Sequence, residues 1–401
     1  LPPRRSAPRP RPRMELGLGW LLIGLPLVFA LGWVASRLDL RQLRFESRSA
    51  PKAYFKGLNY LLTEQQDKAI DAFIEAVRRD PDTAELHFAL GNLFRRRGEY
   101  DRAVRVHEHL LARTDLKPGD RDRAQHALAL DFLKAGLLDR AEQALVNLEG
   151  TAFEAEARLS RLGLYERTGD WTQAAAMAQR LQAMPGATSL GDFSARHAHH
   201  LCEQAEMEMA RGNGAAARQN LEAACAIAPA SARAPTLLAR WLEQELDDSH
   251  GAWQILRTAA RQAPQAVPLF AADWARLAQA VNETAATRAL LEEHYAASPS
   301  LDVLDALVAL APTNHEGEAR QRYLEHLQAT PSLVAAARWM AGEKLEHEQY
   351  HPLVQRAFDH AAQPLQRYRC AACGFESRQY NWRCPGCLAW DSYPPRRIEE
   401  I

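Results

Sequence analysis

The chain has 401 residues, and its 49 Lys and Arg residues nearly balance its 50 Asp and Glu residues, for a formal net charge of −1 at pH 7. This balance gives no global basic excess of the kind that favours nucleic-acid binding. Alanine, leucine, arginine, glutamate and glutamine dominate over long spans with few β-branched residues, and this composition favours helices.

The N-terminal region predicts a membrane anchor. Residues 16–35, LGLGWLLIGLPLVFALGWVA, contain no charged side chain, and their length matches one helical crossing of a bilayer. Trp20 and Trp33 lie near the two ends of this segment, as interfacial aromatic residues do. We therefore predict a transmembrane helix over residues 14–36.

The flanks of this helix predict its orientation. We expect the protein to start at Met14, so that residues 1–13 are a disordered or non-native extension. The arginines then lie in a basic juxtamembrane linker, residues 37–52, and the positive-inside rule places the body of the protein in the cytoplasm. Two alternatives are weaker. A secretory signal peptide would need a small-residue cleavage site, and a buried helix of a globular domain does not need so long an apolar run.

Small and aromatic residues recur through the middle of the chain. Gly57 and Gly91 are 34 residues apart, and each is followed by an aromatic residue three positions later and an alanine twelve positions later. Pro229, Pro264 and Pro299 are each 35 residues apart. The pattern resembles the tetratricopeptide repeat, a helix–turn–helix unit of 34 residues whose small residues let its two helices approach closely.

We therefore predict an all-α fold, a superhelical solenoid of about eight or nine tetratricopeptide units over residues 53–364. Such arrays leave an extended concave face and serve as interaction scaffolds. The repeat family's groove positions correspond here to candidate partner-binding residues, with a solvated polar face as an equal alternative for each. These residues are Tyr54 in the first unit and Glu85, Phe88, Asn92, Arg95 and Arg96 in the second.

The C-terminal stretch 368–390, YRCAACGFESRQYNWRCPGCLAW, contains four of the six cysteines. They form two CxxC pairs with ten residues between them, and two such pairs complete a tetrahedral thiolate site that suits zinc or iron. The segment is too short to fold by its own apolar burial, so the metal has to stabilise it. We predict a metal knuckle and tail over residues 365–401, with one ion bound by Cys370, Cys373, Cys384 and Cys387.

The pattern YxCxxCGF…CPxCxxW resembles a rubredoxin-type knuckle, although rubredoxins have a longer gap between their pairs. A closed four-thiolate site is structural or electron-carrying and is not a hydrolytic centre. The alternative is two disulfides or four unrelated thiols. The remaining cysteines, Cys202 and Cys225, lie in helical patterns and are expected to be buried free thiols, which indicates a reducing compartment. His197 and His200 would share a helix face, but we assign no metal site to them.

The sequence shows no catalytic signature. It contains no phosphate-binding loop, dinucleotide-binding glycine fingerprint, HExxH or GxSxG motif. Its carboxylates are scattered over amphipathic helices, where solvation explains them. We therefore predict that the protein is not an enzyme.

A membrane span, a tetratricopeptide array and a rubredoxin-like knuckle follow one another in that order. This order resembles the lipopolysaccharide assembly protein B family of Gram-negative inner membranes, and the resemblance covers the chain from about residue 14 onward. The stretches that carry it are LNYLLTEQQDKAIDAF (58–73), LGNLFRRRGEYDRAVRVH (90–107) and YRCAACGF…WRCPGCLAW (368–390).

The resemblance implies a single-pass bacterial inner-membrane protein whose body faces the cytoplasm. It implies an adaptor that promotes proteolysis of the UDP-acyl-N-acetylglucosamine deacetylase of lipid A synthesis by a membrane-anchored AAA+ metalloprotease. A lipopolysaccharide-sensing inner-membrane protein is the implied antagonist. The family's metal ligands correspond to the four knuckle cysteines, and its knuckle packs back against the repeats. A homodimer stays an open alternative.

Three other functions remain as alternatives. An iron-loaded knuckle would make the chain a rubredoxin-like electron-transfer protein. A general scaffold of another membrane complex would use the same repeats. A nucleic-acid-binding zinc ribbon would need a basic stripe on the knuckle. The local arginines that raise this last alternative are Arg367, Arg369, Arg378, Arg383, Arg396 and Arg397, although we expect no nucleic-acid partner.

Overall fold

A computed structural model of the chain describes residues 28–33, 52–63, 65–79, 83–184, 191–311, 316–342 and 348–401. The chain forms two compact units, Leu1–Glu154 and Ala155–Ile401. The predicted extension 1–13 lies outside the described residues. The predicted linker 37–52 also lies outside them, except for residue 52, where α2 begins. Of the predicted membrane helix 14–36, the structure describes only a helical stretch at 28–33. Within the described residues, no helix combines the length and apolar character that a bilayer crossing requires.

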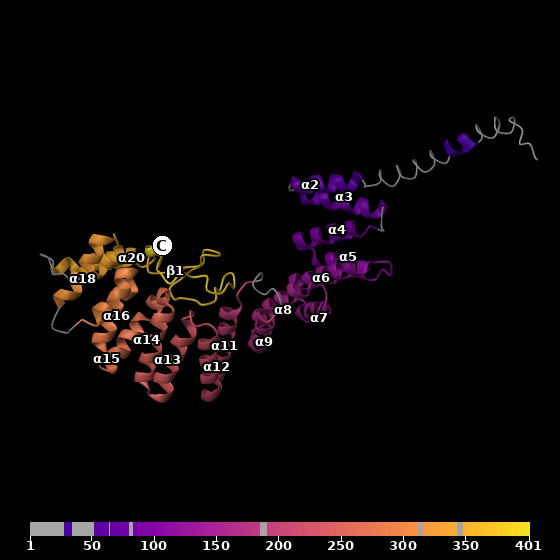
Figure 1. Ribbon diagram of the computed structural model, residues 1–401. Helices are drawn as coiled ribbons and strands as arrows, with labels where there is room; N and C mark the ends of the chain where they lie inside the picture. Colours follow the sequence, from indigo (N-terminus) through magenta and orange to yellow (C-terminus); the bar gives the residue numbers. More distant parts are fainter. Residues whose placement is uncertain are drawn as a thin grey trace, which may run out of the picture. The chain divides into compact units, whose positions relative to one another are not determined.

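The first unit consists of antiparallel helix pairs that follow one another along the chain (Figure 1). Its pairs are α2 (Lys52–Leu62) with α3 (Gln66–Arg79), α4 (Ala84–Arg97) with α5 (Tyr100–Leu111), and α6 (Pro118–Ala135) with α7 (Leu138–Val146).

The second unit continues the same alternation. Its helices are α8 (Glu154–Thr168), which begins at the boundary, α9 (Trp171–Gln182), α11 (Ser194–Ala210), α12 (Gly214–Ile227), α13 (Arg233–Leu246), α14 (Ser249–Gln262), α15 (Ala271–Ala280), α16 (Thr284–Ala297), α17 (Leu301–Ala309), α18 (Glu316–Ala329), α19 (Leu333–Ala341) and α20 (His351–Ala362), with 3-10 turns η1 (Pro264–Leu269) and η2 (Glu348–Tyr350). The predicted all-α solenoid of helix pairs is confirmed.

Close helix approach explains the recurring glycines. A Cβ atom added at Gly57 would lie 2.7 Å from the ring of Phe73, and one added at Gly91 would lie 2.5 Å from the ring of His107. Both contacts are far shorter than van der Waals contact, so an alanine at either position would push the two helices of its pair apart. The glycine spacing in the sequence therefore reports helix packing, as predicted.

A buried polar network joins successive repeats of the first unit. Asp131 on α6 and His107 on α5 are both 0% exposed, and the His107 Nδ1 atom lies 2.5 Å from an Asp131 carboxylate oxygen. Arg95 on α4 donates to the other Asp131 oxygen at 2.8 Å and to the Ala127 carbonyl at 3.1 Å. Buried charge is retained only where it is paired in this way.

This network changes the interpretation of the predicted partner-binding residues. Arg95 and Asn92 bind each other at 2.5 Å, and Arg95 is committed to Asp131, so both serve contacts within the chain. Phe88 is 2% exposed and packs with Leu110 and Ala124, which removes its ring from the surface that was expected to meet a partner. Helix packing, and not position in the groove, decides where this ring lies.

The other predicted groove residues have different positions. Glu85 forms an exposed ion pair with Arg123 at 2.7 Å. Arg96 is exposed, and its role as a partner-binding residue stays a prediction. The side chain of Tyr54 lies outside the part of the chain that the structure describes.

The predicted metal knuckle follows α20 as a small domain. Two short antiparallel strands, β1 (Tyr368–Arg369) and β2 (Glu376–Ser377), pair with Tyr368 opposite Ser377, and a single bridge joins Arg383 to Trp390. The chain ends in the 3-10 turn η3 (Ile398–Glu400). The knuckle lies in the second unit, against its repeats (Figure 1).

Candidate metal centre

The four predicted ligands lie together. The sulfur atoms of Cys370, Cys373, Cys384 and Cys387 are all within 4.8 Å of one another. The Cys370 and Cys387 sulfurs are 3.8 Å apart, and those of Cys373 and Cys384 are 3.6 Å apart. A tetrahedral ion with metal–sulfur bonds of about 2.3 Å requires sulfurs about 3.8 Å apart, so the cluster fits one zinc or iron ion.

The two CxxC turns have the same backbone geometry. In the first turn the Gly374 N–H donates to the Cys370 carbonyl at 2.8 Å, and in the second the Leu388 N–H donates to the Cys384 carbonyl at 2.9 Å. Both residues have left-handed backbones, with φ of 78° at Gly374 and 62° at Leu388. Glycine adopts this conformation without strain, whereas leucine pays an energetic cost for it, so the second turn is held by the surrounding knuckle.

The cluster has an inner and an outer side. Cys370 and Cys384 are 1% and 0% exposed, whereas Cys373 and Cys387 face solvent. Burial opposes ionisation of the Cys370 thiol. The Ser392 hydroxyl, 3.2 Å from its sulfur, and the nearby backbone amides outweigh burial and lower its pKa to about 6. The surroundings of Cys370 therefore favour the thiolate that a metal ion requires. At Cys373 the backbone amide of Phe375 lowers the thiol pKa, but desolvation and contacts with the other three thiols outweigh it and raise the pKa to about 12, so not all four thiols ionise readily without an ion.

Four thiolates would complete the coordination of a tetrahedral ion and leave no position for water or substrate. The residues present therefore suit a structural or electron-carrying ion, and they do not form a hydrolytic centre. The other two cysteines lie outside the cluster and are free; Cys202 is buried, as predicted, whereas Cys225 is only half-buried. Burial raises the pKa of Cys202 to about 12 and that of Cys225 to about 11, so both stay protonated and unreactive near neutral pH.

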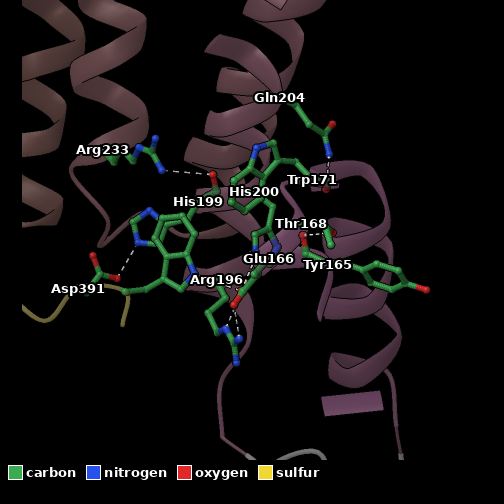
Figure 2. A network of polar contacts seen from close by, with 11 residues as sticks. Tyr165, Glu166, Thr168, Trp171, Arg196, His199, His200, Gln204, Arg233 and Asp391 are labelled. Atoms are coloured by element: carbon green, nitrogen blue, oxygen red, sulfur yellow. Dashed lines mark hydrogen bonds and ion pairs between the residues drawn. The ribbon is translucent and has the colours of Figure 1, made fainter. Parts of the chain in front are cut away.

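The knuckle is attached to the repeats through Trp390. Its ring stacks on His199 of α11, with ring centroids 4.7 Å apart and planes 9° apart, and it meets Trp171 of α9 edge-on at 6.1 Å. His199 also binds the knuckle carboxylate of Asp391 through Nε2 at 2.7 Å, as Figure 2 shows. Arg383 of the knuckle lies over both tryptophan rings, 5.3 Å from that of Trp390.

Glu166, near the end of α8, is the polar centre of this contact (Figure 2). One of its carboxylate oxygens accepts from the indole N–H of Trp390 at 3.1 Å and lies 2.7 Å from Nε2 of His200. Arg196 donates to both carboxylate oxygens, at 3.2 and 2.8 Å. Burial opposes ionisation of Glu166, but the hydrogen bonds from His200 and Arg196 outweigh it and lower its pKa to about 2.

Arg233, the first residue of α13, completes the attachment. It is 5% exposed, its guanidinium lies 5.7 Å from the centre of the Trp390 ring, and it donates to Glu203 at 2.8 Å and to Glu206 at 3.0 Å. The contact therefore joins α8, α9, α11 and α13 to one knuckle residue, Trp390.

The C-terminal tail forms a second attachment to later repeats. Glu399 accepts hydrogen bonds from the Ser332 hydroxyl at 2.8 Å and from the first backbone amides of α19, and Glu400 accepts from the Leu301 N–H at the start of α17 at 2.6 Å. A carboxylate at a helix N-terminus satisfies unpaired amides and the positive end of the helix dipole. Arg397 binds both oxygens of Asp302 at 2.8 and 2.9 Å.

Sequence reasoning identified the metal ligands but missed most residues that hold the knuckle in place. The run RHAHHLC did contain a signal, since it includes Arg196, His199 and His200. His199 binds Asp391 of the knuckle, and His200 binds Glu166 of α8. Glu166 and Arg233 had no signal in a single sequence, because charged residues on amphipathic helices are usually solvated.

Two family models match parts of the chain. The model described as a rubredoxin metal binding domain matches residues 368–394, which include all four clustered cysteines. The tetratricopeptide repeat model matches residues 86–122, from within α4 to the start of α6.

Curated relatives match along nearly the whole chain. Lipopolysaccharide assembly protein B of Escherichia coli K12 is 29% identical over 390 residues, covering 94% of this chain and 98% of the relative. The protein of the same name from Haemophilus influenzae is 27% identical over 413 residues, covering 95% and 98%. A solved tetratricopeptide repeat protein from Parabacteroides merdae is 14% identical with a TM-score of 0.33, covering 65% of this chain and 97% of its own. The expected resemblance is confirmed: from its repeats to its knuckle, this chain is similar to the lipopolysaccharide assembly protein B family.

Proposed function

We propose that this chain is a non-enzymatic, membrane-anchored adaptor that takes part in lipopolysaccharide assembly. The observation that carries the proposal is the similarity to lipopolysaccharide assembly protein B over 94% of the chain and 98% of the relative. Helix-pair repeats support it, because such arrays act through the surfaces they present to other proteins.

The adaptor would work at the bacterial inner membrane with its body on the cytoplasmic side. It would bring the UDP-acyl-N-acetylglucosamine deacetylase of lipid A synthesis to a membrane-anchored AAA+ metalloprotease, and a lipopolysaccharide-sensing inner-membrane protein would oppose it. Residues 14–36 would confine the chain to the membrane plane, which raises the effective concentration of adaptor and protease without new contacts.

The knuckle has a structural task in this proposal. Through Trp390 it contacts α8, α9, α11 and α13, and through the tail glutamates it contacts α17 and α19, so a bound ion would fix the arrangement of these helices. The chain's own residues contribute binding surface and shape, and the protease carries out the cleavage.

The first experiment is an affinity pull-down from detergent-solubilised native membranes, read by mass spectrometry. We expect the wild-type chain to recover the protease and the deacetylase, and the Cys370→Ser variant to lose them. Cys225→Ser is the matched control, because Cys225 is a free thiol outside the cluster. Recovery of neither protein by the wild type would refute the adaptor proposal.

A second experiment tests the anchor. Deletion of residues 14–36 should leave the repeats folded but abolish deacetylase turnover, because the chain would no longer share a membrane with the protease. The measurement is the half-life of the deacetylase after protein synthesis is stopped. Undiminished turnover would show that membrane confinement is not needed.

Electron transfer is the second candidate, and the exposed outer sulfurs favour it. Cys373 and Cys387 face solvent beside Phe375 and Leu388, which are 44% and 43% exposed. An electron-transfer role predicts native iron in the cluster and a reversible change in visible absorption on reduction. Native zinc in the cluster, with no absorption change on reduction, would exclude electron transfer and support a structural role for the ion.

A further inference from the structure

A polar cavity of about 480 Å³ lies between α13 and the knuckle. One face of α13 contributes Arg233, Thr236 and Arg240, and the C-terminal region contributes Arg378, Gln379 and Arg397. No carboxylate is among the described residues that line it. The cavity is therefore bordered by four guanidinium groups that come from separate parts of the sequence.

Two of these guanidinium groups are already committed. Arg397 binds both oxygens of Asp302, and Arg233 binds Glu203 and Glu206. These ion pairs hold the walls of the cavity in place and leave little positive charge for a ligand.

The other two guanidinium groups are available. The Arg240 side chain is 54% exposed and donates a single N–H to Asp273, at 3.1 Å. Exposed pairs of this kind contribute little to stability and exchange readily. Arg378 is exposed and has no ion pair with any residue that the structure describes. A guanidinium fork with free N–H groups is suited to a carboxylate or a phosphate.

A second cavity indicates which anion is the better fit. It has a volume of about 410 Å³ and shares Leu269, Tyr380 and Trp382 with the first cavity. Most of the remaining wall is apolar, with Ile227 at the end of α12 and Pro229 in the turn before α13. Asp192 and Asp391 also line this cavity, so the acidic side chain of a ligand belongs at the arginines of the first cavity and an apolar side chain belongs here. An inorganic phosphate would fill only the polar cavity, whereas a peptide with acidic and apolar side chains would fill both.

We propose that the paired cavities bind an acidic segment of a protein partner. A carboxylate of that segment lies between Arg240 and Arg378, and a neighbouring apolar side chain enters the cavity beyond Trp382. The partner is thus recognised jointly by a repeat helix and by the knuckle, so its binding requires a docked knuckle. This inference does not depend on the identity of the proteins named under the proposed function.

The test uses random dodecapeptides displayed on phage and selected on the full chain, with counter-selection on the Arg240→Gln/Arg378→Gln double variant. We expect the surviving peptides to be rich in Asp and Glu next to apolar residues. Synthetic copies should lose at least tenfold in affinity when their acidic residues are replaced by amides, measured by fluorescence anisotropy.

Matched variants locate the site. Arg240→Gln and Arg378→Gln should each weaken the selected peptides about tenfold, whereas Arg218→Gln, an exposed arginine paired with Glu222 on α12, should not. Metal content and circular dichroism confirm that each variant is folded. The proposal is overturned if no peptide survives counter-selection, if the survivors carry no acidic excess, or if Arg218→Gln weakens binding as much as the cavity variants.

Discussion

Contacts between repeats and contacts of the knuckle span very different distances along the chain. Arg196 binds Glu166 across 30 residues, and Trp253 donates to Thr287 across 34. In contrast, Trp390 of the knuckle donates to Glu166 across 224 residues. Repeat arrays are held by nearest-neighbour contacts, so their stability is a sum of local terms. The knuckle instead ties several repeats of the second unit to one small domain.

The first unit, in contrast, is held by contacts between neighbouring helices. Its polar network of Arg95, His107 and Asp131 joins α4, α5 and α6 and uses only neighbouring helices. Loss of the metal should therefore affect the second unit far more than the first.

The largest expected effect is that of metal loss. Cys370→Ser, or chelation, should unfold the knuckle, because structural ions in small domains provide about 10–16 kcal/mol of apparent folding free energy. Hydrogen exchange should then accelerate at the starts of α11, α13, α17 and α19, while residues 83–150 stay protected. Equal acceleration of exchange in both units would show that the knuckle does not stabilise the second unit selectively. Cys225→Ser should keep both the metal and the protection.

Removal of Trp390 should have the next largest effect. Trp390→Ala deletes the stack on His199 and leaves Glu166 without its indole donor, so we expect the free energy of unfolding to fall by about 2–4 kcal/mol. Trp390→Phe should lose less, since it keeps the ring. Both variants should retain the metal. Phe375→Ala, at an exposed position of the same knuckle, should change the unfolding free energy by less than about 0.5 kcal/mol.

Acid should weaken the same attachment. Burial lowers the pKa of His200 in the fold, so the stability that its neutral form contributes is complete above its ordinary pKa of 6.5 and falls as the pH drops below that value. The lowered pKa of Glu166 affects stability at more acidic pH. Its stabilising contribution is complete above its ordinary pKa of 4.5 and is lost as the pH falls from 4.5 to about 2.

Urea unfolding between pH 7.5 and 6, with metal content monitored, measures the histidine part of this effect. The wild type should lose stability across this range, and His200→Gln should flatten the dependence. A slope that persists in His200→Gln would assign the effect to another group.

The smallest expected effect comes from the tail. Glu399→Ala removes the acceptor at the start of α19 and should cost about 1–2 kcal/mol. Thermal unfolding of the second unit measures it, and Glu245→Ala, an exposed glutamate on α13, is the control. If the two variants behave alike, the tail does not stabilise the last repeats.

The sequence by itself determined the features that repeat or that follow fixed spacing. The spacing of Gly57 and Gly91 predicted closely packed helix pairs, and the two CxxC motifs predicted the four metal ligands. Both patterns could be recognised because each results from contacts within one short segment or one repeat.

Tertiary structure decided the rest. Phe88 was expected in a groove and is buried, since its burial depends on how α4 packs against α5 and α6. His199, Glu166 and Glu399 have their partners 192, 224 and 67 residues away. No periodicity links such positions, so only the folded chain, in which the knuckle returns to the repeats, brings them together.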